Sequence, residues 1–191
     1  ACLVIFAWGV IYFVAGAHLT LLIGMAGAVV GAGTIAYSAS EHFARRIDGF
    51  LSPEVDPRTQ LGYATNAIQE GGFFGVGVGE GEVKWSLPDA HTDFIFSIIG
   101  EELGFFAISI MVFLFLYLVL KILYLAFHST DRFSGLVLVG ISTIFLSHIF
   151  VNCSMASGMI PVKGLPHPFV SYGGSILISS FIMIGIVINF S

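Results

Sequence analysis

The chain has 191 residues, of which 10% are charged and 57% are apolar, and its mean hydropathy is +0.96. Soluble domains carry roughly 25% charged residues, so this balance indicates an integral membrane protein. The seven Lys and Arg residues and the net charge of −5 exclude a basic surface for nucleic acid. The two cysteines lie far apart in apolar runs, so neither a disulfide framework nor a thiolate metal site is expected.

The first residues, ACLVIFAWGVIYFVAGA, form an apolar run without a basic start, unlike a signal peptide. This run resembles a helix cut partway, which indicates the C-terminal portion of a longer protein. A helix needs about 20 apolar residues to cross about 30 Å of hydrocarbon. We therefore predict an all-α polytopic membrane protein with one transmembrane domain. Its predicted spans are residues 1–17, 19–40, 59–79, 94–120, 133–160 and 175–191, of which 59–79 is the least apolar.

Orientation is predicted from the basic residues, which are retained in the cytoplasm during insertion. Whether or not residues 59–79 cross, the seven basic residues divide five against two. Arg45 and Arg46 directly follow a span, which favours a crossing at 59–79. This choice places residues 41–58, residues 121–132 and the C-terminus inside, and it places the loops 80–93 and 161–174 outside.

Four acidic side chains, those of Asp89, Asp93, Glu101 and Glu102, are concentrated in LPDAHTDFIFSIIGEELG, residues 87–104. A helix is predicted to begin near Asp93, with Thr92 as its N-cap. Helical spacing then places Asp93 and Glu101 on one side and Glu102 opposite. Pattern alone favours a hydrated helix end for the two glutamates and a helix-start acid at Asp93 over a shared cavity lining. His91 fits no zinc motif and is more often an ordinary loop histidine.

Two irregular segments flank this region. The run GGFFGVGVGEG (71–81) lacks the strand and the Lys of a phosphate-binding loop, and it is predicted to be a flexible segment at a membrane boundary. The run MIPVKGLPHPFVSYGGS (159–175) is predicted to fold back over a site, because irregular backbone at membrane depth must be buried or hydrated. Lys163 in this run suits either an anionic ligand or solvent.

These segments resemble a known family. The runs LP-x-x-HTDFIF-x-x-x-x-EELG and P-V-x-G-x-P-x-P-x-x-SYGGS, in this order, are similar to those of the SEDS peptidoglycan glycosyltransferases, which include RodA, SpoVE and FtsW. The sequence Lys163-Gly164-Leu165 resembles the division branch, FtsW, more than the elongation branch, RodA. The resemblance covers nearly the whole chain and implies about six helices from the later part of a ten-helix fold.

The resemblance implies an inverting glycosyltransferase that polymerises lipid II into glycan strands during cell division. It implies that Asp93 is catalytic, since a carboxylate in a partly buried cleft can take the proton of the attacking sugar hydroxyl. Lys163, a residue upstream of the chain, or a divalent cation would stabilise the leaving pyrophosphate. Mg²⁺ or Mn²⁺ is the family expectation, and the sequence gives no ligand set. The residues expected to bind substrate or position loops are His91, Thr92, Lys163, Ser171 and Glu101.

The implied location is the division septum of the bacterial plasma membrane, with the catalytic loops on the outer face. The implied partners are lipid II, a class B penicillin-binding protein and other division proteins, but no nucleic acid. Two alternatives remain open at this point. A lipid II flippase would carry similar polar residues at the outer leaflet, and a scaffold for the penicillin-binding protein would need the same membrane fold.

Overall fold

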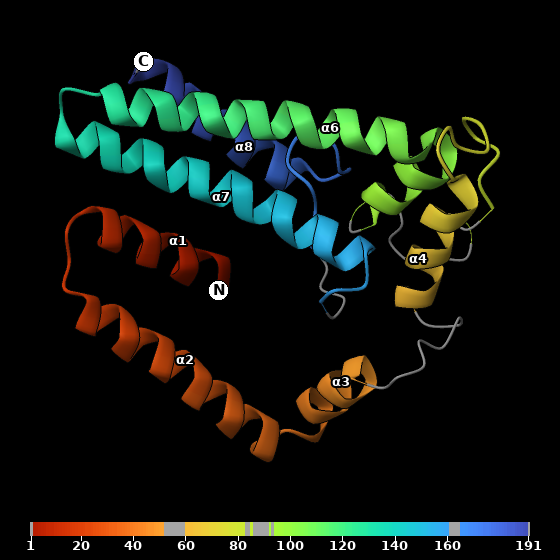
Figure 1. Ribbon diagram of the computed structural model, residues 1–191, viewed down its shortest axis with the longest axis horizontal. Helices are drawn as coiled ribbons and strands as arrows, with labels where there is room; N and C mark the ends of the chain where they lie inside the picture. Colours follow the sequence, from red (N-terminus) through yellow and green to blue (C-terminus); the bar gives the residue numbers. More distant parts are fainter. Residues whose placement is uncertain are drawn as a thin grey trace.

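The computed structural model describes residues 2–51, 60–82, 85, 92, 94–160 and 165–190, and the regular elements in this part of the chain are all helices. Figure 1 shows their order along the chain. This confirms the predicted all-α class. The helices are α1 (Cys2–Val14), α2 (Leu19–Ala39), α3 (Glu41–Leu51), α4 (Gln60–Gly71), α6 (Ile95–His128), α7 (Arg132–Ala156) and α8 (Gly174–Asn189).

The main buried cluster lies in a bundle of α6, α7 and α8, along the upper side of the molecule in Figure 1. Its core is aliphatic and aromatic, and Leu138, Phe145 and Val119 are at most 1% exposed. The outer faces of the same helices carry exposed Phe, Leu, Ile and Tyr side chains. Because a bilayer is as apolar as the core, such a surface is stable in lipid and not in water. The helices α2, α6 and α7 are long and apolar enough to cross a membrane, whereas α1 and α8 are shorter.

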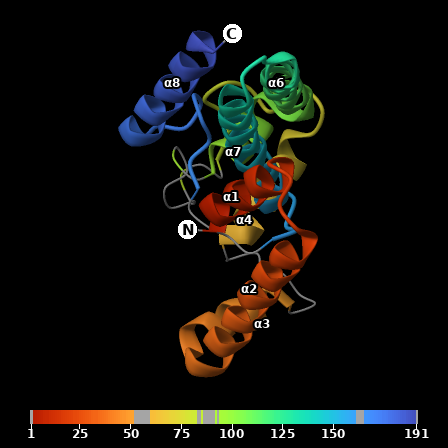
Figure 2. The same ribbon diagram turned by 90° about the vertical axis from the view of Figure 1, so that its left-hand side faces the viewer.

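The helices α2 and α3 project away from this bundle (Figure 2). No described residue of α2 is buried, although the helix has 21 residues. The amphipathic helix α3 was not predicted, because residues 41–58 were expected to be a loop. Tyr37 of α2 donates a hydrogen bond to Asp48 of α3 over 2.8 Å, which joins the two helices.

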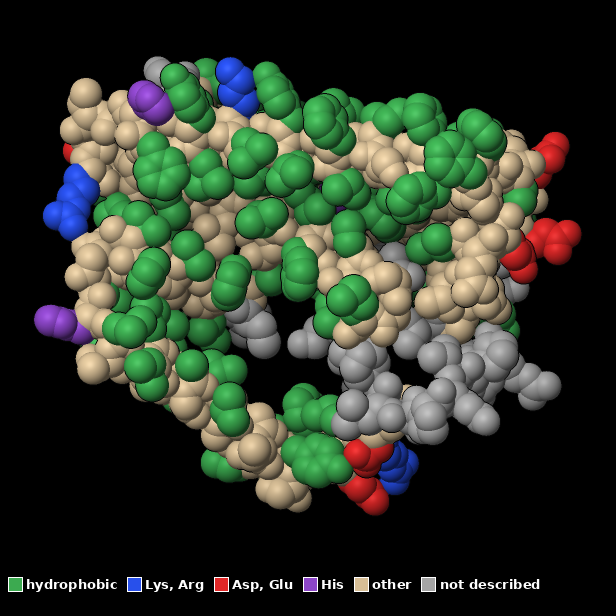
Figure 3. All heavy atoms as spheres, in the orientation of Figure 1, with side chains coloured by type: hydrophobic (Ala, Val, Ile, Leu, Met, Phe, Trp, Pro, Cys, Tyr) green, Lys and Arg blue, Asp and Glu red, His purple; other side chains and the backbone are tan. Residues whose placement is uncertain are grey.

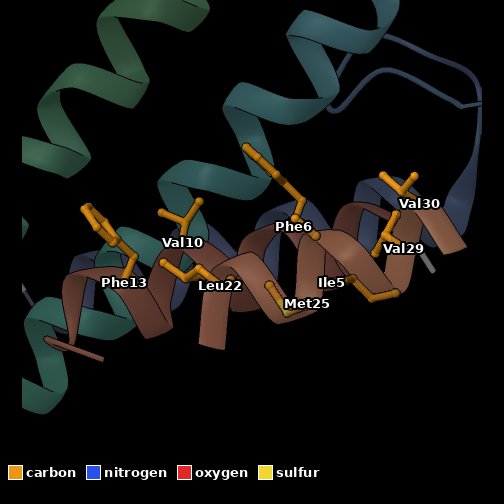
Figure 4. Close-up of a pocket in the computed structure, with 10 residues that line it drawn as sticks. Ile5, Phe6, Val10, Phe13, Leu22, Met25, Val29 and Val30 are labelled. Carbon is orange, nitrogen blue, oxygen red and sulfur yellow. The ribbon is translucent and has the colours of Figure 1, made fainter. Parts of the chain in front are cut away.

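An apolar groove of about 540 Å³ separates α1 from α2 (Figure 4). Phe6, Phe13, Met25 and Val29 are among the residues that line it, and none of its lining side chains is charged. Such a surface can hold hydrocarbon but offers no acid, base or ligand for a metal. The groove is therefore not the site of chemistry.

The turn after α1 contacts the start of α7. Arg132 donates a hydrogen bond to the carbonyl of Ala15 over 2.6 Å. The helix α4 has 12 residues, which rise roughly 18 Å. Glycines with positive φ, beginning with Gly72 (φ 55°), then turn the chain. The order in which the segments cross the membrane stays a prediction.

The helix boundaries in the rest of the chain differ less from the predicted spans. The helix α6 begins at Ile95 with Phe94 in the N-cap position, so the predicted cap at Thr92 is wrong. It continues to His128, eight residues beyond the predicted end, because the apolar pattern tolerates Lys121 on an exposed face. The rings of Phe133 and Phe190 lie 6.5 Å apart, so the end of α8 and the start of α7 share one end of the bundle.

The start of α7 is capped by Asp131, and this gives a first prediction. The Asp131 carboxylate accepts hydrogen bonds from Ser134 N over 2.9 Å and from Ser134 Oγ over 2.7 Å. Both hydrogen bonds lower the pKa of the Asp131 carboxyl, and the bond from the Ser134 hydroxyl has the larger effect. The stabilisation is fully present above the unfolded-state pKa of about 3.9 and is lost as pH falls through the lower folded-state pKa.

We expect Asp131→Ala to lower the midpoint of thermal unfolding at pH 7 and to have a smaller effect at pH 3, measured in detergent by circular dichroism. Asp131→Asn is the control, because an Asn side chain caps a helix without a charge. An Asp131→Ala effect of equal size at both pH values would contradict a role for the ionised carboxylate.

Candidate functional site

Acidic side chains lie where α4 meets the start of α6, and others lie on α3 and at the start of α7. Figure 3 shows the first group, a second group with a basic side chain on α3, and Lys and Arg side chains near the far end of α6 and α7. In the first group Glu70, Glu80 and Glu82 are exposed, and Glu102 is half-buried. The predicted stretch of acids includes Asp89 and Asp93, which lie outside the described residues, so their gathering at this end stays a prediction.

The predicted site residues divide into two groups. Asp93, His91 and Lys163 lie outside the described residues, so their roles stay predictions. Thr92 is described and half-buried. Glu101 and Ser171 are both buried, with exposed fractions of 1% and 4%. Glu101 of α6 contacts the glycine-rich segment. Ser171 forms hydrogen bonds within the turn around His167. No contact among the described residues links these two places.

The helix α6 is interrupted at Gly104, where φ is 77° and ψ is −179°. The interruption leaves carbonyl groups before Gly104 and N–H groups after it without partners in the helix. The glycine-rich segment supplies these partners. Val76 N donates to Glu101 O over 2.9 Å, and Phe105 N donates to Gly72 O over 2.9 Å.

Two further bonds extend this pairing. Gly77 N donates to the carbonyl of Glu102 over 3.1 Å, and Phe106 N donates to the carbonyl of Phe73 over 3.1 Å. We call residues 71–81 the glycine loop. Because four backbone bonds hold it to α6, the glycine loop is docked, and our prediction of a flexible boundary segment is wrong. Irregular backbone is thereby satisfied within the protein, as membrane depth requires.

Glu101 occupies the centre of this docking. It is 1% exposed, so the hydrated helix end that pattern alone allowed is wrong for this residue. A Cβ added at Gly81 would lie 2.7 Å from both the carboxyl carbon and Oε2 of Glu101. The glycine at position 81 therefore lets the chain pass directly over the carboxyl group. Ser97, one turn earlier in α6, is buried on the same helix and is 1% exposed.

Ser171 belongs to a buried turn that sequence reasoning did not identify. His167 N donates to Ser171 Oγ over 2.7 Å, and Ser171 N donates to His167 O over 3.0 Å. His167 is 1% exposed, and its ring stands edge-on to Phe115 with centroids 4.5 Å apart. Ser171 therefore shapes the loop rather than facing an open surface. The signal for His167 was a titratable residue between two prolines in an apolar segment.

The segment around Ser171 enters the bundle instead of covering it. The ring of Phe169 packs against those of Phe145 and Phe181, with centroid distances of 5.8 and 5.5 Å. Phe115 lies near the middle of α6, so the loop reaches deep between α6, α7 and α8. This depth explains why α8 has only 16 residues, since the loop replaces its first turns.

No metal site can be assembled from the described residues, since no three His, Cys, Asp or Glu side chains group closely there. A buried carboxylate orders its surroundings, and an ionisable one in the adjacent segment can accept a proton. The predicted Mg²⁺ or Mn²⁺ has no ligand set among the described side chains.

A family model described as cell cycle protein, FTSW_RODA_SPOVE, matches residues 1–191. The chain belongs to the FtsW, RodA and SpoVE family. This family confirms both the resemblance and the multi-pass membrane fold, and its members below carry names of probable peptidoglycan glycosyltransferases.

Several curated relatives carry the name probable peptidoglycan glycosyltransferase FtsW. That of Trichlorobacter lovleyi is 39% identical over 189 residues, covering 95% of this chain and 49% of that protein. That of Tolumonas auensis is 41% identical over 186 residues, covering 93% and 48%. That of Bacillus subtilis is 43% identical over 126 residues, covering 65% and 31%. The chain spans about half the length of the first two.

Proposed function

We propose that the chain forms part of a peptidoglycan glycosyltransferase that polymerises lipid II into glycan strands during cell division. The observation that carries this proposal is the family match over residues 1–191, together with relatives named probable peptidoglycan glycosyltransferase FtsW. The acidic end of the bundle supports it, because that end bears both ends of the segment in which Asp93 lies.

The proposed reaction uses Asp93 as the general base. Its carboxylate takes the proton of the attacking sugar 4-hydroxyl, a bond forms from that oxygen to the anomeric carbon of the donor, and the bond to the lipid pyrophosphate breaks with inversion. Lys163 is proposed to balance the charge of the leaving pyrophosphate. Mg²⁺ or Mn²⁺ stays a proposal, and no step is assigned to it because the described residues supply no ligand set.

The other predicted residues are proposed to position loops. Glu101 is buried in α6 beneath Gly81, and Ser171 is buried in the turn at His167, which suits residues that shape a site more than residues that touch a sugar. Thr92 and His91 adjoin Asp93 in the sequence and are proposed to orient it.

We also propose that the acidic end faces outward from the bacterial plasma membrane, at the division septum. Lys121 and Arg132 lie near the opposite end of α6 and α7, and basic residues are retained in the cytoplasm. The end of α8 lies near the start of α7, so the C-terminus is proposed to be cytoplasmic. A class B penicillin-binding protein is the proposed partner that crosslinks the strand.

The test is Asp93→Asn in membranes that contain the protein, its partner and lipid II. We expect loss of glycan strands on gels, because an amide cannot take the hydroxyl proton. Asp89→Asn is the matched control, since it removes a charge from the same segment without removing the base.

The flippase alternative makes a different prediction. A flippase would retain lipid II movement across the bilayer in Asp93→Asn and would make no glycan in either form. Equal glycan synthesis by Asp93→Asn and the unchanged protein would contradict the proposed base.

A further inference from the structure

The glycine loop has one side that packs on α6 and another that is exposed and apolar. Gly71 and Gly75 face α6, because a Cβ added at either position would overlap a backbone carbonyl of that helix. Four apolar side chains of the loop are 42–80% exposed, namely those of Phe73, Phe74, Val76 and Val78. The alternation of glycine with apolar residues therefore separates a side of close backbone contact from a side of exposed hydrocarbon.

The exposed side of the loop joins the exposed start of the long part of α6. The ring centroid of Phe73 lies 5.0 Å from that of Phe74, and it lies 6.3 and 6.2 Å from those of Phe105 and Phe106. All four rings are at least 53% exposed. We call these four residues the phenyl patch. Contiguous apolar surface of this kind is costly in water and marks a site of contact with another apolar body.

The position of the phenyl patch along α6 gives its depth. Lys121 is the first charged residue of α6 after Gly104, and its side chain is exposed. From Lys121 back to Phe105 the helix rises about 24 Å, whereas the hydrocarbon of a bilayer is about 30 Å thick. If the ammonium group of Lys121 reaches one boundary of the hydrocarbon, Phe105 still lies inside the other. Ring contact then places Phe73 at the same depth.

The phenyl patch also continues a stripe along the outer face of α6. Phe106, Ile110, Phe113 and Tyr117 follow at helical spacing and are 46–67% exposed. Such a stripe in the middle of an apolar helix faces lipid. The backbone beneath the patch is suited to the same environment, because its N–H and carbonyl groups pair with each other through the four bonds between the glycine loop and α6.

We propose that the glycine loop is a membrane anchor, which inserts Phe73 and Phe74 beside Phe105 and Phe106 among the acyl chains of the nearer leaflet. The contact is with hydrocarbon rather than with anionic headgroups, because the nearby exposed side chains Glu70 and Glu80 are acidic. The inference does not depend on the proposed function. It gives the loop a fixed depth at the edge of the hydrocarbon.

The experiment measures the depth of single tryptophans in the full chain, reconstituted in phosphatidylcholine vesicles. The background is Trp8→Phe/Trp85→Phe, which removes both tryptophans of the chain. Phe74→Trp reports the loop, because Phe74 is 80% exposed and a larger ring fits there. Phe113→Trp is the reference for a lipid-facing residue of α6. Glu80→Trp is the matched control in the same loop.

Bromine on the acyl chains quenches a tryptophan that lies in hydrocarbon, and iodide quenches one that lies in water. With bromine near the glycerol end of the chains, we expect quenching of Phe74→Trp to be at least about threefold stronger than that of Glu80→Trp. With bromine near the middle of the bilayer, Phe113→Trp should be quenched most, since it lies about 12 Å further along α6 than Phe105. Iodide should quench Glu80→Trp most.

Other occupants of the phenyl patch give different results. Strong quenching of Phe74→Trp by iodide would show a patch in water. Weak quenching of Phe74→Trp by both bromine and iodide would show that protein covers the patch, either a second copy or another helix. Each of these two results would overturn the inference.

A second measurement tests whether insertion holds the loop in place. Phe74→Asp puts a charge at the depth of the patch, where an acid is costly, so the loop should move toward water. We expect the amides of Val76 and Gly77 to exchange at least about tenfold faster in Phe74→Asp vesicles than in the parent. Phe74→Leu keeps an apolar side chain and should stay within about threefold of the parent. Equal exchange in Phe74→Asp and Phe74→Leu would show that the loop is not anchored by lipid.

Discussion

Gly104→Ala should destabilise the protein by about 3 kcal/mol, because the backbone at φ 77° and ψ −179° belongs to a region that only glycine occupies readily. A Cβ at this position would also overlap Gly75 N and lie 2.5 Å from Phe73 O. Straightening the helix would avoid the strain, but it would separate Phe105 N and Phe106 N from their acceptors in the glycine loop. The variant can form a continuous helix α6 or keep the hydrogen bonds between α6 and the glycine loop, but not both.

Unfolding by denaturant in detergent measures the loss of stability, and amide exchange at Phe105 and Phe106 locates it. Gly185→Ala in α8 is the matched control, since no atom lies within 4 Å of the added methyl group. Alanine is favoured over glycine inside a helix by about 1 kcal/mol, so this control should be neutral or stabilising. Equal stability of Gly104→Ala and Gly185→Ala would show that the interruption is not required.

Hydropathy predicted the long apolar helices well, because α2, α6 and α7 are each continuous in the sequence. It did not predict the interruption at Gly104. The bonds that satisfy the interrupted helix come from residues about 30 positions earlier, and a local window does not include them. Phe105 and Phe106 are apolar residues of the kind found in any membrane helix, so the apolar pattern continues through the interruption at Gly104.

The same limitation applies to the glycine loop and the site. Alternation of glycine with apolar residues was interpreted as flexibility, whereas its physical meaning is close approach of two backbones at Gly71 and Gly75. The predicted cluster of acids in residues 87–104 stays a prediction, because Asp89 and Asp93 lie outside the described residues. The burial of Glu101 was not predicted, because helix spacing gives the direction of a side chain and not what covers it.

The buried turn at Phe169 was missed for a related reason. Prolines and glycines predicted irregular backbone in residues 159–175, but they did not indicate whether this backbone lies over the bundle or within it. Ring contacts with Phe115, Phe145 and Phe181 place it within. Aromatic side chains in such a loop are the available signal, because a loop exposed to water would gain nothing from burying them.

Phe169→Ala should destabilise the protein by about 2–3 kcal/mol, since a half-buried ring with three aromatic neighbours is removed. Phe169 has φ 62°, a left-handed conformation that costs a residue with a Cβ roughly 1–2 kcal/mol. Phe169→Gly loses the same ring but removes this cost, so it should be more stable than Phe169→Ala by about 1 kcal/mol. The order should reverse at Phe181, which lies in α8, because glycine inside a helix is less stable than alanine by about 1 kcal/mol. Denaturant unfolding of the four variants in one detergent measures both differences, and a Phe169→Gly variant less stable than Phe169→Ala would show that the left-handed turn is absent.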